Sequence, residues 1–272
     1  ALMAGNAVVL KHASNVPQCA LALEAAFQQA SFPTHTFRTL MISAAQAEQV
    51  IADRRIAAIT LTGSSAAGRK VAAIAGQHLK KCVLELGGSD PFIVLDDADI
   101  EWTAQQALIA RLQNMGQSCI AAKRFILQET IADSFVERLQ VLISQLRSGD
   151  PKDAATTIAP MARMDLRNEL HAQVERSLAL GAKLLTGGFS IGEQGAYYAP
   201  TILDHVQPGM PAFDEELFGP VFAIMRVGNA EEAIKLANQT QFGLGGSVWT
   251  GDLARGEALA RQIHAGCTFV NG

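Results

Sequence analysis

Apolar runs of strand length alternate with longer segments of helical period along the whole chain. The elements expected in the first part are strands at residues 7–11, 57–62 and 82–86, with helices that begin near Pro17, after Ser43 and after Ser64. The run at 57–62 is expected to be a buried strand. An order in which strands and helices alternate predicts a mostly parallel sheet with helices on both faces.

The second part repeats this alternation after a pair of glycines. The elements expected there are strands at 91–95, 124–128, 221–227 and 267–272, with helices at 99–113, 130–147, around 163–180 and around 230–240. Gly87 and Gly88 close the last strand of the first part, and we place a domain boundary there. The predicted fold class is therefore α/β, with one domain over residues 1–87 and a second over residues 88–272.

The composition is typical of a protein with a substantial core. The 272 residues are 49% apolar and 18% charged, and 22 basic against 26 acidic residues give a net charge of −4. No run of lysine or arginine occurs, so binding to nucleic acid or to an anionic membrane surface is not expected. No apolar stretch approaches the roughly 20 residues that cross a bilayer.

The four cysteines lie far apart, with no pair at CxxC spacing. They are Cys19, Cys82, Cys119 and Cys267. This pattern disfavours a disulfide framework and a zinc site, and it favours a reducing compartment, the cytoplasm. The six histidines show no metal-ligand spacing, so no metal site is expected. Because the chain starts with Ala1 and its last apolar run stops abruptly, we expect it to be part of a longer protein.

A glycine-bounded turn follows the strand at 57–62. Gly63, Ser64 and Gly68 lie where this strand would lead into a helix, and helix N-terminal N–H groups favour a phosphate. Arg69 follows the second glycine where a P-loop would carry lysine, so the turn is not a P-loop, and it does not match GxGxxG. From the residues alone, a structural turn and a phosphate site both stay open.

Glu85 and Cys119 are the candidates for chemistry. Glu85 lies in an apolar strand that runs into two glycines, where a carboxylate must be paired, desolvated or directed into a cleft. It is either a structural glutamate or a general base. Cys119 lies in a polar loop with the amides Asn114 and Gln117. Backbone and amide N–H groups there could lower the thiol pKa from about 8.5 and hold an oxyanion. The other three cysteines are expected to be small buried apolar residues.

A further segment, residues 215–220 (EELFGP), by itself indicates only a loop with a buried aromatic ring. Taken together, however, the segments resemble the aldehyde dehydrogenase superfamily in type and in order. The resemblance is carried by Lys11 after a strand, residues 62–64 with Gly68, residues 85–88, residues 116–119 and residues 215–220. It covers essentially the whole chain. It implies the fold of that family, with part of a Rossmann-type cofactor domain followed by a catalytic α/β domain.

The resemblance also implies a reaction. Cys119 would attack an aldehyde to give a thiohemiacetal, and hydride transfer to NAD or NADP would leave a thioester. Glu85 would activate the water that hydrolyses this thioester, and it could also help to deprotonate Cys119. The N–H of Cys119 would be half of the oxyanion hole.

The resemblance assigns cofactor binding to a set of residues from both parts. They are Lys11, Ser14, Gly63, Ser64, Gly68, Leu86, Glu216 and Phe218. Lys11 would bind the adenosine ribose, the turn at 63–68 would lie under the pyrophosphate, and Glu216 would bind the nicotinamide ribose beside Phe218. Ser14 stands where NAD-preferring members often carry glutamate. Without that carboxylate the site would also admit the 2′-phosphate of NADP.

Within the family, residues 80–91 and 113–124 look most like bacterial NAD(P)-dependent succinate-semialdehyde dehydrogenases. Many of these carry an arginine where Gln113 stands, to hold the substrate carboxylate. Arg111 is a possible substitute anchor, although a helical arginine can equally be a solvated surface group. The resemblance also implies a homo-oligomer, either a dimer or a tetramer.

Two segments of the family pattern lie outside the chain. The asparagine that supplies the second oxyanion donor would precede residue 1, and a Phe-Gly-Gly segment with the oligomer-forming tail would follow residue 272. We therefore expect this stretch alone to be crippled or inactive. Two alternatives to a hydrolytic aldehyde dehydrogenase remain. One is a CoA-acylating relative, which would lack the glutamate at position 85, and the other is a non-catalytic truncated relative.

Overall fold

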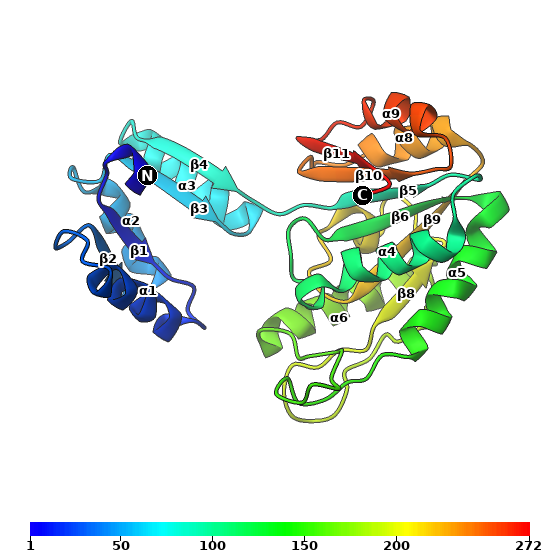
Figure 1. Cartoon of the computed structure of the whole chain (residues 1–272), viewed down its shortest axis with the longest axis horizontal. Helices are drawn as coiled ribbons and strands as arrows, with labels where there is room; N and C mark the ends of the chain where they lie inside the picture. The colour runs from blue at the N-terminus through cyan, green and yellow to red at the C-terminus, as the bar shows by residue number, and fades with distance from the viewer. The chain divides into compact units, whose positions relative to one another are not determined.

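The computed structural model describes residues 1–272 and divides them into two compact units (Figure 1). The first unit is Ala1–Leu86 and the second is Gly87–Gly272. The division lies one residue from the boundary placed at Gly87 and Gly88. Both units contain helices and mainly parallel strands, as the predicted α/β class requires. None of the helices is long and apolar enough to span a bilayer.

The first unit has four strands, three α-helices and one short 3-10 helix. They are η1 (Leu2–Ala4), β1 (Val8–Lys11), α1 (Pro17–Gln29), β2 (Phe37–Leu40), α2 (Ala44–Ala52), β3 (Ala58–Thr62), α3 (Ser65–Gln77) and β4 (Lys81–Glu85). The helices begin where the sequence predicts. Pro17 opens α1, and the Ser43 and Ser64 hydroxyls accept N–H groups in the first turns of α2 and α3.

The strands of the first unit form two separate parallel pairs rather than one sheet. β1 pairs with β2, and β3 pairs with β4. The helix α3 packs against β3 and β4, and alternate side chains of both strands are exposed within the unit. The expectation of a buried strand at 57–62 is therefore wrong. Thr60 and Thr62 lie on the exposed face, and their alternation with Ile59 and Leu61 is typical of a half-covered strand.

The second unit is larger and is built on one seven-stranded sheet. Its elements are β5 (Asp90–Val94), α4 (Ile100–Leu112), η2 (Gln113–Gly116), β6 (Ala122–Gln128), α5 (Glu129–Ser144), α6 (Met164–Ala179), β7 (Lys183–Thr186), β8 (Thr201–Asp204), α7 (Pro211–Asp214), β9 (Val221–Val227), α8 (Ala230–Asn238), β10 (Gly245–Trp249), α9 (Leu253–Ala260) and β11 (Cys267–Val270). The strand order is β11-β10-β5-β6-β9-β8-β7, and only β7 runs antiparallel to its neighbour.

The central strands of this sheet are buried on both faces. Phe92 and Val94 of β5 pack into a cluster with α4 and α5, whereas Ile93 and Leu95 pack into a cluster with α6, α8 and α9. The ring of Phe125 stands 5.2 Å from the Phe92 ring on the first of these faces. Burial on both faces explains the continuous apolar runs of β5, β6 and β9.

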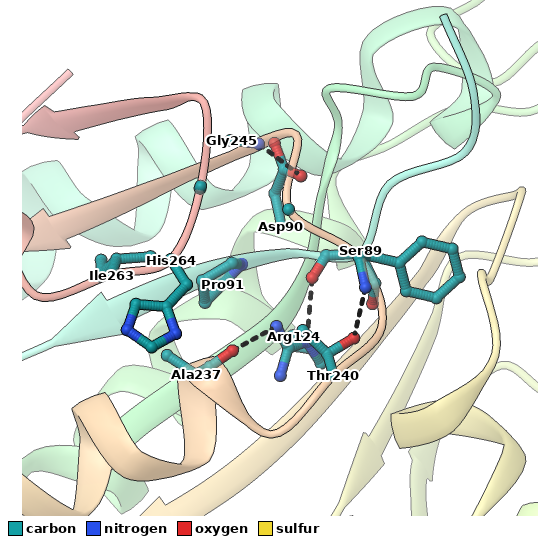
Figure 2. A pocket seen from close by; sticks show the side chains of 12 residues that line it. Ser89, Asp90, Pro91, Arg124, Ala237, Thr240, Gly245, Ile263 and His264 are labelled. Carbon is teal, nitrogen blue, oxygen red and sulfur yellow. Dashed lines mark hydrogen bonds between the residues drawn. The ribbon is translucent and has the colours of Figure 1, made fainter. Parts of the chain in front are cut away.

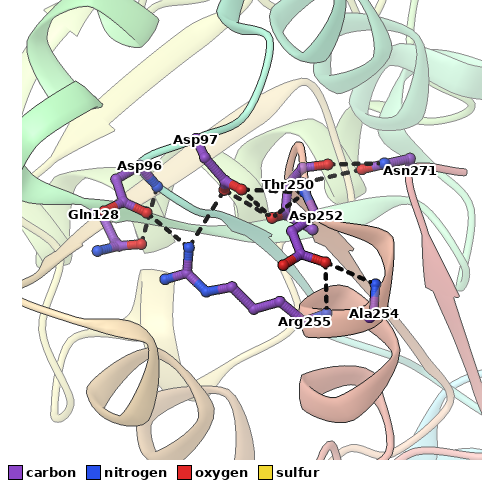
Figure 3. A network of polar contacts seen from close by, with 8 residues as sticks. All are labelled: Asp96, Asp97, Gln128, Thr250, Asp252, Ala254, Arg255 and Asn271. Atoms are coloured by element: carbon purple, nitrogen blue, oxygen red, sulfur yellow. Dashed lines mark hydrogen bonds and ion pairs between the residues drawn. The ribbon is translucent and has the colours of Figure 1, made fainter.

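Because these strands are parallel, the loops that precede them share one edge of the sheet. At the opposite, carboxyl edge, a polar network joins the ends of β5, β10 and β11 (Figure 3). The Thr250 hydroxyl after β10 donates to Asp97 after β5 at 2.7 Å. Asn271 after β11 exchanges two hydrogen bonds with the Thr250 backbone, at 2.9 and 3.0 Å. These side chains join three neighbouring strands at the edge opposite to the candidate site.

The cysteines expected in the interior are more exposed than predicted. Cys19 and Cys267 are exposed, and Cys82 is half-buried. Cys19 lies on α1, while the other two lie on strands that are covered only in part within their units.

Candidate active site

Three segments of the second unit meet at the amino edge of its sheet. Gly87 and Gly88 precede β5, and the other two segments carry Cys119, before β6, and Glu216, before β9. A Cβ added to Gly88 would lie 2.6 Å from the carbonyl oxygen of Cys119. One added to Gly87 would lie 2.2 Å from Oε2 of Glu216. The Gly88 N–H donates to Oε1 of Glu216 at 3.1 Å. The glycine pair is therefore needed for close approach and does more than end a strand.

The turn between α4 and the cysteine has an unusual backbone. Asn114, Met115 and Gly116 have φ angles of 50°, 57° and 73°, in the left-handed region that costs residues other than glycine roughly 1–2 kcal/mol each. The Asn114 amide donates to the Gln117 carbonyl at 3.0 Å, and the Gln117 side-chain oxygen accepts from the Ala162 N–H at 2.8 Å. The Asn114 amide, expected among the donors to a thiolate, thus shapes the loop instead.

Cys119 itself is half-buried, and its thiol is free. Its backbone N–H has no hydrogen-bond acceptor within the unit. That N–H belongs to the same planar peptide as the Ser118 carbonyl, which accepts from Lys123 Nζ at 2.9 Å and from the Ala121 N–H at 3.2 Å. The Cys119 N–H is therefore oriented but unused. Such a donor suits an oxyanion that forms when the neighbouring thiolate attacks a carbonyl.

Arg111, near the end of α4, is fully buried. Its Nη1 donates to the Ala122 carbonyl at 2.8 Å, and its Nη2 donates to the carbonyls of Gly116 and Leu217. These contacts correct both expectations for Arg111, because it is neither a solvated surface group nor open to a substrate carboxylate. Its guanidinium instead joins the turn, β6 and the 215–220 segment. Gln113 is exposed and stays a predicted substrate residue.

Lys123, which is absent from the predicted site residues, is a second buried cation. Its side chain is 1% exposed, and Nζ lies 3.5 Å from Oε1 of Glu216. The pKa of Lys123 is lowered to about 8, mainly by burial and also by the charge of Arg111, whereas Glu216 opposes this lowering. The signal in the sequence is a Lys-Arg pair at the start of an otherwise apolar strand, where a charge must find partners.

The second member of this pair, Arg124, secures the start of β5 (Figure 2). Its Nε donates to the Ser89 carbonyl at 2.9 Å, and its Nη2 donates to the Ala237 carbonyl at the end of α8, also at 2.9 Å. Asp90 accepts from the first N–H of β10 at 3.2 Å. Burial raises the pKa of Asp90, and Lys123 opposes that effect. Buried charges of both signs therefore hold the backbone where β5 and β10 begin.

A cavity of about 370 Å³ opens beside the residue that follows Cys119. Ile109 of α4, Ile120 of the cysteine loop and Phe269 of β11 are among its mainly apolar lining residues. Its size and lining suit the carbon chain of a small molecule. Phe218, on the neighbouring segment, is half-buried.

In the first unit, the predicted cofactor residues lie at the carboxyl ends of strands. Gly63 and Ser64 follow β3, and the Gly63 N–H donates to the carbonyl of Glu85 at the end of β4, at 3.0 Å. A Cβ on Gly68 would lie 2.5 Å from Cδ2 of Leu86, so α3 packs directly on the residue after Glu85. The structure thus brings these two segments together at the edge where open parallel sheets bind ligands.

Lys11 ends β1, and Ser14 is exposed three residues later.

The Glu85 side chain is exposed within its unit and has no ion-pair partner there. Of the three alternatives for this carboxylate, pairing and desolvation are not seen within the unit, because β4 is covered on one face only. Direction into a cleft stays a prediction. Glu85 and Cys119 belong to different units.

Comparison with known proteins decides the family. The sequence model of the aldehyde dehydrogenase family matches residues 1–272. The chain belongs to the aldehyde dehydrogenase family. A relative from Synechocystis sp., named as a probable succinate-semialdehyde dehydrogenase (NADP(+)), is 51% identical over 272 residues, which are 100% of this chain and 60% of the relative.

Two further proteins that are similar to this chain carry related names. The Escherichia coli succinate semialdehyde dehydrogenase (NAD(P)+) Sad is 49% identical over 271 residues, covering 100% of this chain and 59% of the relative. The crystal structure of a Streptococcus pyogenes succinic semialdehyde dehydrogenase with NADP+ has a TM-score of 0.96 and 39% identity, and covers 98% of this chain and 59% of that one. The chain therefore spans about 60% of the length of the relatives it matches.

Proposed function

We propose that the full-length protein oxidises a short semialdehyde, succinate semialdehyde foremost, to the carboxylate with NAD or NADP. The observation that best supports this function is the setting of Cys119. Its free thiol lies in a strained loop, its N–H is unused, and its carbonyl packs on Gly88. A nucleophile and an oriented oxyanion donor on the same residue are what attack on an aldehyde requires.

In this mechanism the Cys119 thiolate adds to the aldehyde carbon, and the Cys119 N–H stabilises the resulting oxyanion. NAD(P)+, when bound, supplies the hydride acceptor. The thioester that remains on Cys119 is hydrolysed by a water whose proton Glu85 accepts, which releases the carboxylate and returns the thiol. Glu85 is three residues from Gly88, so their Cα atoms lie within roughly 11 Å of each other whatever the arrangement of the units.

The turn after β3 fits a dinucleotide pyrophosphate. The 13-residue helix α3 begins there, and the first N–H groups of a helix have no partners within it. A Cβ on Gly63 would meet nothing closer than 3.8 Å, so the turn is open to a ligand. We assign the pyrophosphate to Gly63, Ser64 and Gly68, and the adenosine ribose to Lys11. We assign the nicotinamide end to a set of three residues, Leu86, Glu216 and Phe218.

The substrate is proposed from three observations. The relatives with 49–51% identity carry the name succinate-semialdehyde dehydrogenase. The cavity beside Ile120 is of the size that a short carbon chain needs, and Gln113 is exposed at the end of α4.

We also infer from the family resemblance that the full-length protein is a cytoplasmic homo-oligomer, a dimer or a tetramer. Light scattering of the purified protein tests the oligomeric state.

The direct test is NAD(P)H formation by the full-length protein with a panel of semialdehydes, with and without CoA. We expect an acid product that does not need CoA. Cys119→Ser should lower turnover by at least about 10³-fold, because serine is a far weaker nucleophile at neutral pH. Cys19→Ser, at an exposed cysteine of α1, is the matched control and should retain turnover. A CoA-dependent product would favour the acylating alternative, and no NAD(P)H with any aldehyde would contradict the proposal.

A further inference from the structure

Lys123 folds back onto the loop that carries the proposed nucleophile. Its Nζ donates to the carbonyls of Ser118 and Cys119, both at 2.9 Å, and to the carbonyl of Ala121 at 3.0 Å. An ammonium has three donors, and here each has a backbone acceptor. Burying a lysine is unfavourable unless its N–H donors are hydrogen-bonded. Here the three bonds satisfy Lys123, and they also restrain the loop that carries Cys119.

The geometry of these bonds has a consequence for the opposite side of each peptide. In a trans peptide the C=O and the following N–H point in opposite directions. When the Ser118 carbonyl points at Lys123, the N–H of Cys119 must point away from it. When the Cys119 carbonyl points at Lys123, the N–H of Ile120 must also point away. Neither N–H has an acceptor within the unit. Lys123 therefore fixes the direction of two unused donors on the nucleophile loop.

Glu216 limits the position of the same ammonium. Its Oε1 lies 3.5 Å from Nζ and also accepts the Gly88 N–H, and its side chain is 19% exposed. Glu216 thus reaches the surface while Lys123 does not. The titratable groups that act on Lys123 are Glu216 and Asp90, which favour its charge, and Arg111, which opposes it.

We propose that Lys123 is a positioning residue of the reaction: it holds the Ser118–Cys119 peptide so that the Cys119 N–H faces the oxyanion. This inference rests on the proposed function of Cys119. Lys123 does not touch the reacting atoms and acts only through the backbone. Its loss should therefore impair the step in which the oxyanion forms more than it impairs the thiol itself.

The test compares Lys123→Met with Lys235→Met in the full-length protein. Lys235 is an exposed lysine of α8 and serves as the matched control. Three quantities are measured: kcat with the aldehyde, the rate at which iodoacetamide alkylates Cys119, and the Kd for NADPH. Alkylation displaces iodide and forms no oxyanion. We expect Lys123→Met to lower kcat by about 100-fold, the effect of losing one oxyanion donor. Its alkylation rate and its Kd should stay within about threefold of the wild type.

The outcomes separate the two proposals. If the wild type turns over an aldehyde and Lys123→Met keeps kcat within about threefold, Lys123 has no positioning role. Equal losses in all three quantities would indicate a merely structural residue and would also overturn the inference. A wild type that turns over no aldehyde contradicts the proposed function instead.

A second variant and a wild-type structure cover the case in which Lys123→Met does not fold. Lys123→Gln keeps an N–H donor and should show a smaller loss of kcat with the same unchanged alkylation rate. If neither variant folds, a crystal structure of the wild type with an aldehyde adduct on Cys119 decides. The Cys119 N–H should donate to the adduct oxygen while Nζ still holds the Ser118 carbonyl. An adduct oxygen turned away from that N–H would contradict the inference.

Discussion

Two buried cations near Cys119 act on backbone carbonyls rather than on carboxylates alone. Arg111 binds three carbonyls and Lys123 binds another three, so together they hold both ends of the cysteine loop. The pKa of Arg111 is lowered to about 9 and that of Lys123 to about 8, in both cases mainly because burial disfavours the charged form. The contacts of Arg111 and Lys123 restrain the loop that carries Cys119, the proposed nucleophile.

A different residue, Ser14, should decide the cofactor. It is exposed three residues after the end of β1 and carries no charge. We predict that Ser14→Glu raises the KM for NADP by at least about tenfold, because a carboxylate near the 2′-phosphate repels it by roughly 1–2 kcal/mol. The KM for NAD should change by less than about threefold. Ser14→Gln, which has the same size without the charge, is the control. Equal effects of the two variants on NADP would refute an electrostatic role for this position.

At the scale of elements, the glycines between β4 and β5 set how closely the loops pack. Gly88 faces the Cys119 carbonyl at a distance that excludes any Cβ, whereas Gly76 near the end of α3 has open space around it. We predict that Gly88→Ala displaces the cysteine loop and lowers kcat by at least about tenfold. Gly76→Ala should leave kcat unchanged and should stabilise the protein by about 0.5–1 kcal/mol, because alanine favours a helix.

Steady-state kinetics and urea unfolding of the full-length variants measure both effects. A Gly88→Ala enzyme with wild-type kcat would show that the loop tolerates the added methyl group. In that case the close approach of Gly88 to the Cys119 carbonyl would not be needed for catalysis.

The elements found from sequence are those with long apolar or amphipathic patterns and clear caps, such as α2, α3, β6 and β9. β10 is not predicted, because it begins with two glycines, which weaken a strand. The fold explains them: a Cβ on Gly245 would lie 2.5 Å from Oδ2 of Asp90, and one on Gly246 would lie 3.1 Å from Pro91. The helix α9 is short and contains Gly256, whose Cβ would lie 2.6 Å from Val270. Such tertiary contacts leave no local pattern to read.

The candidate site, like the fold, is predicted from the sequence only in part. Cys119, Gly63 and Glu216 stand in recognisable segments, and the structure brings the segments of each unit together. Lys123 and Arg111 act through contacts with backbone carbonyls, and a sequence does not show where a long side chain ends. From the sequence, Arg111 could be a surface residue of a helix. In the structure, the turn at 114–116 and the 215–220 segment cover it and accept its hydrogen bonds.

At the scale of the whole molecule, the chain is a member of the aldehyde dehydrogenase family whose two units carry complementary halves of the proposed chemistry. The first unit holds Glu85 and the proposed dinucleotide-binding turn at the carboxyl ends of its strands. The second holds Cys119 at the amino edge of its sheet. In the proposed reaction, a thioester formed on the second unit is hydrolysed with the help of a carboxylate of the first.

The most direct test of that hydrolysis step is a pre-steady-state measurement on Glu85→Gln in the full-length protein, with intact-mass analysis of the mixed sample. We predict a burst of about one NAD(P)H per active subunit, then slow turnover, and an acyl group attached to Cys119, because the amide cannot accept the proton of water. Steady turnover at the wild-type rate, with no burst and no acyl group on Cys119, would contradict the account.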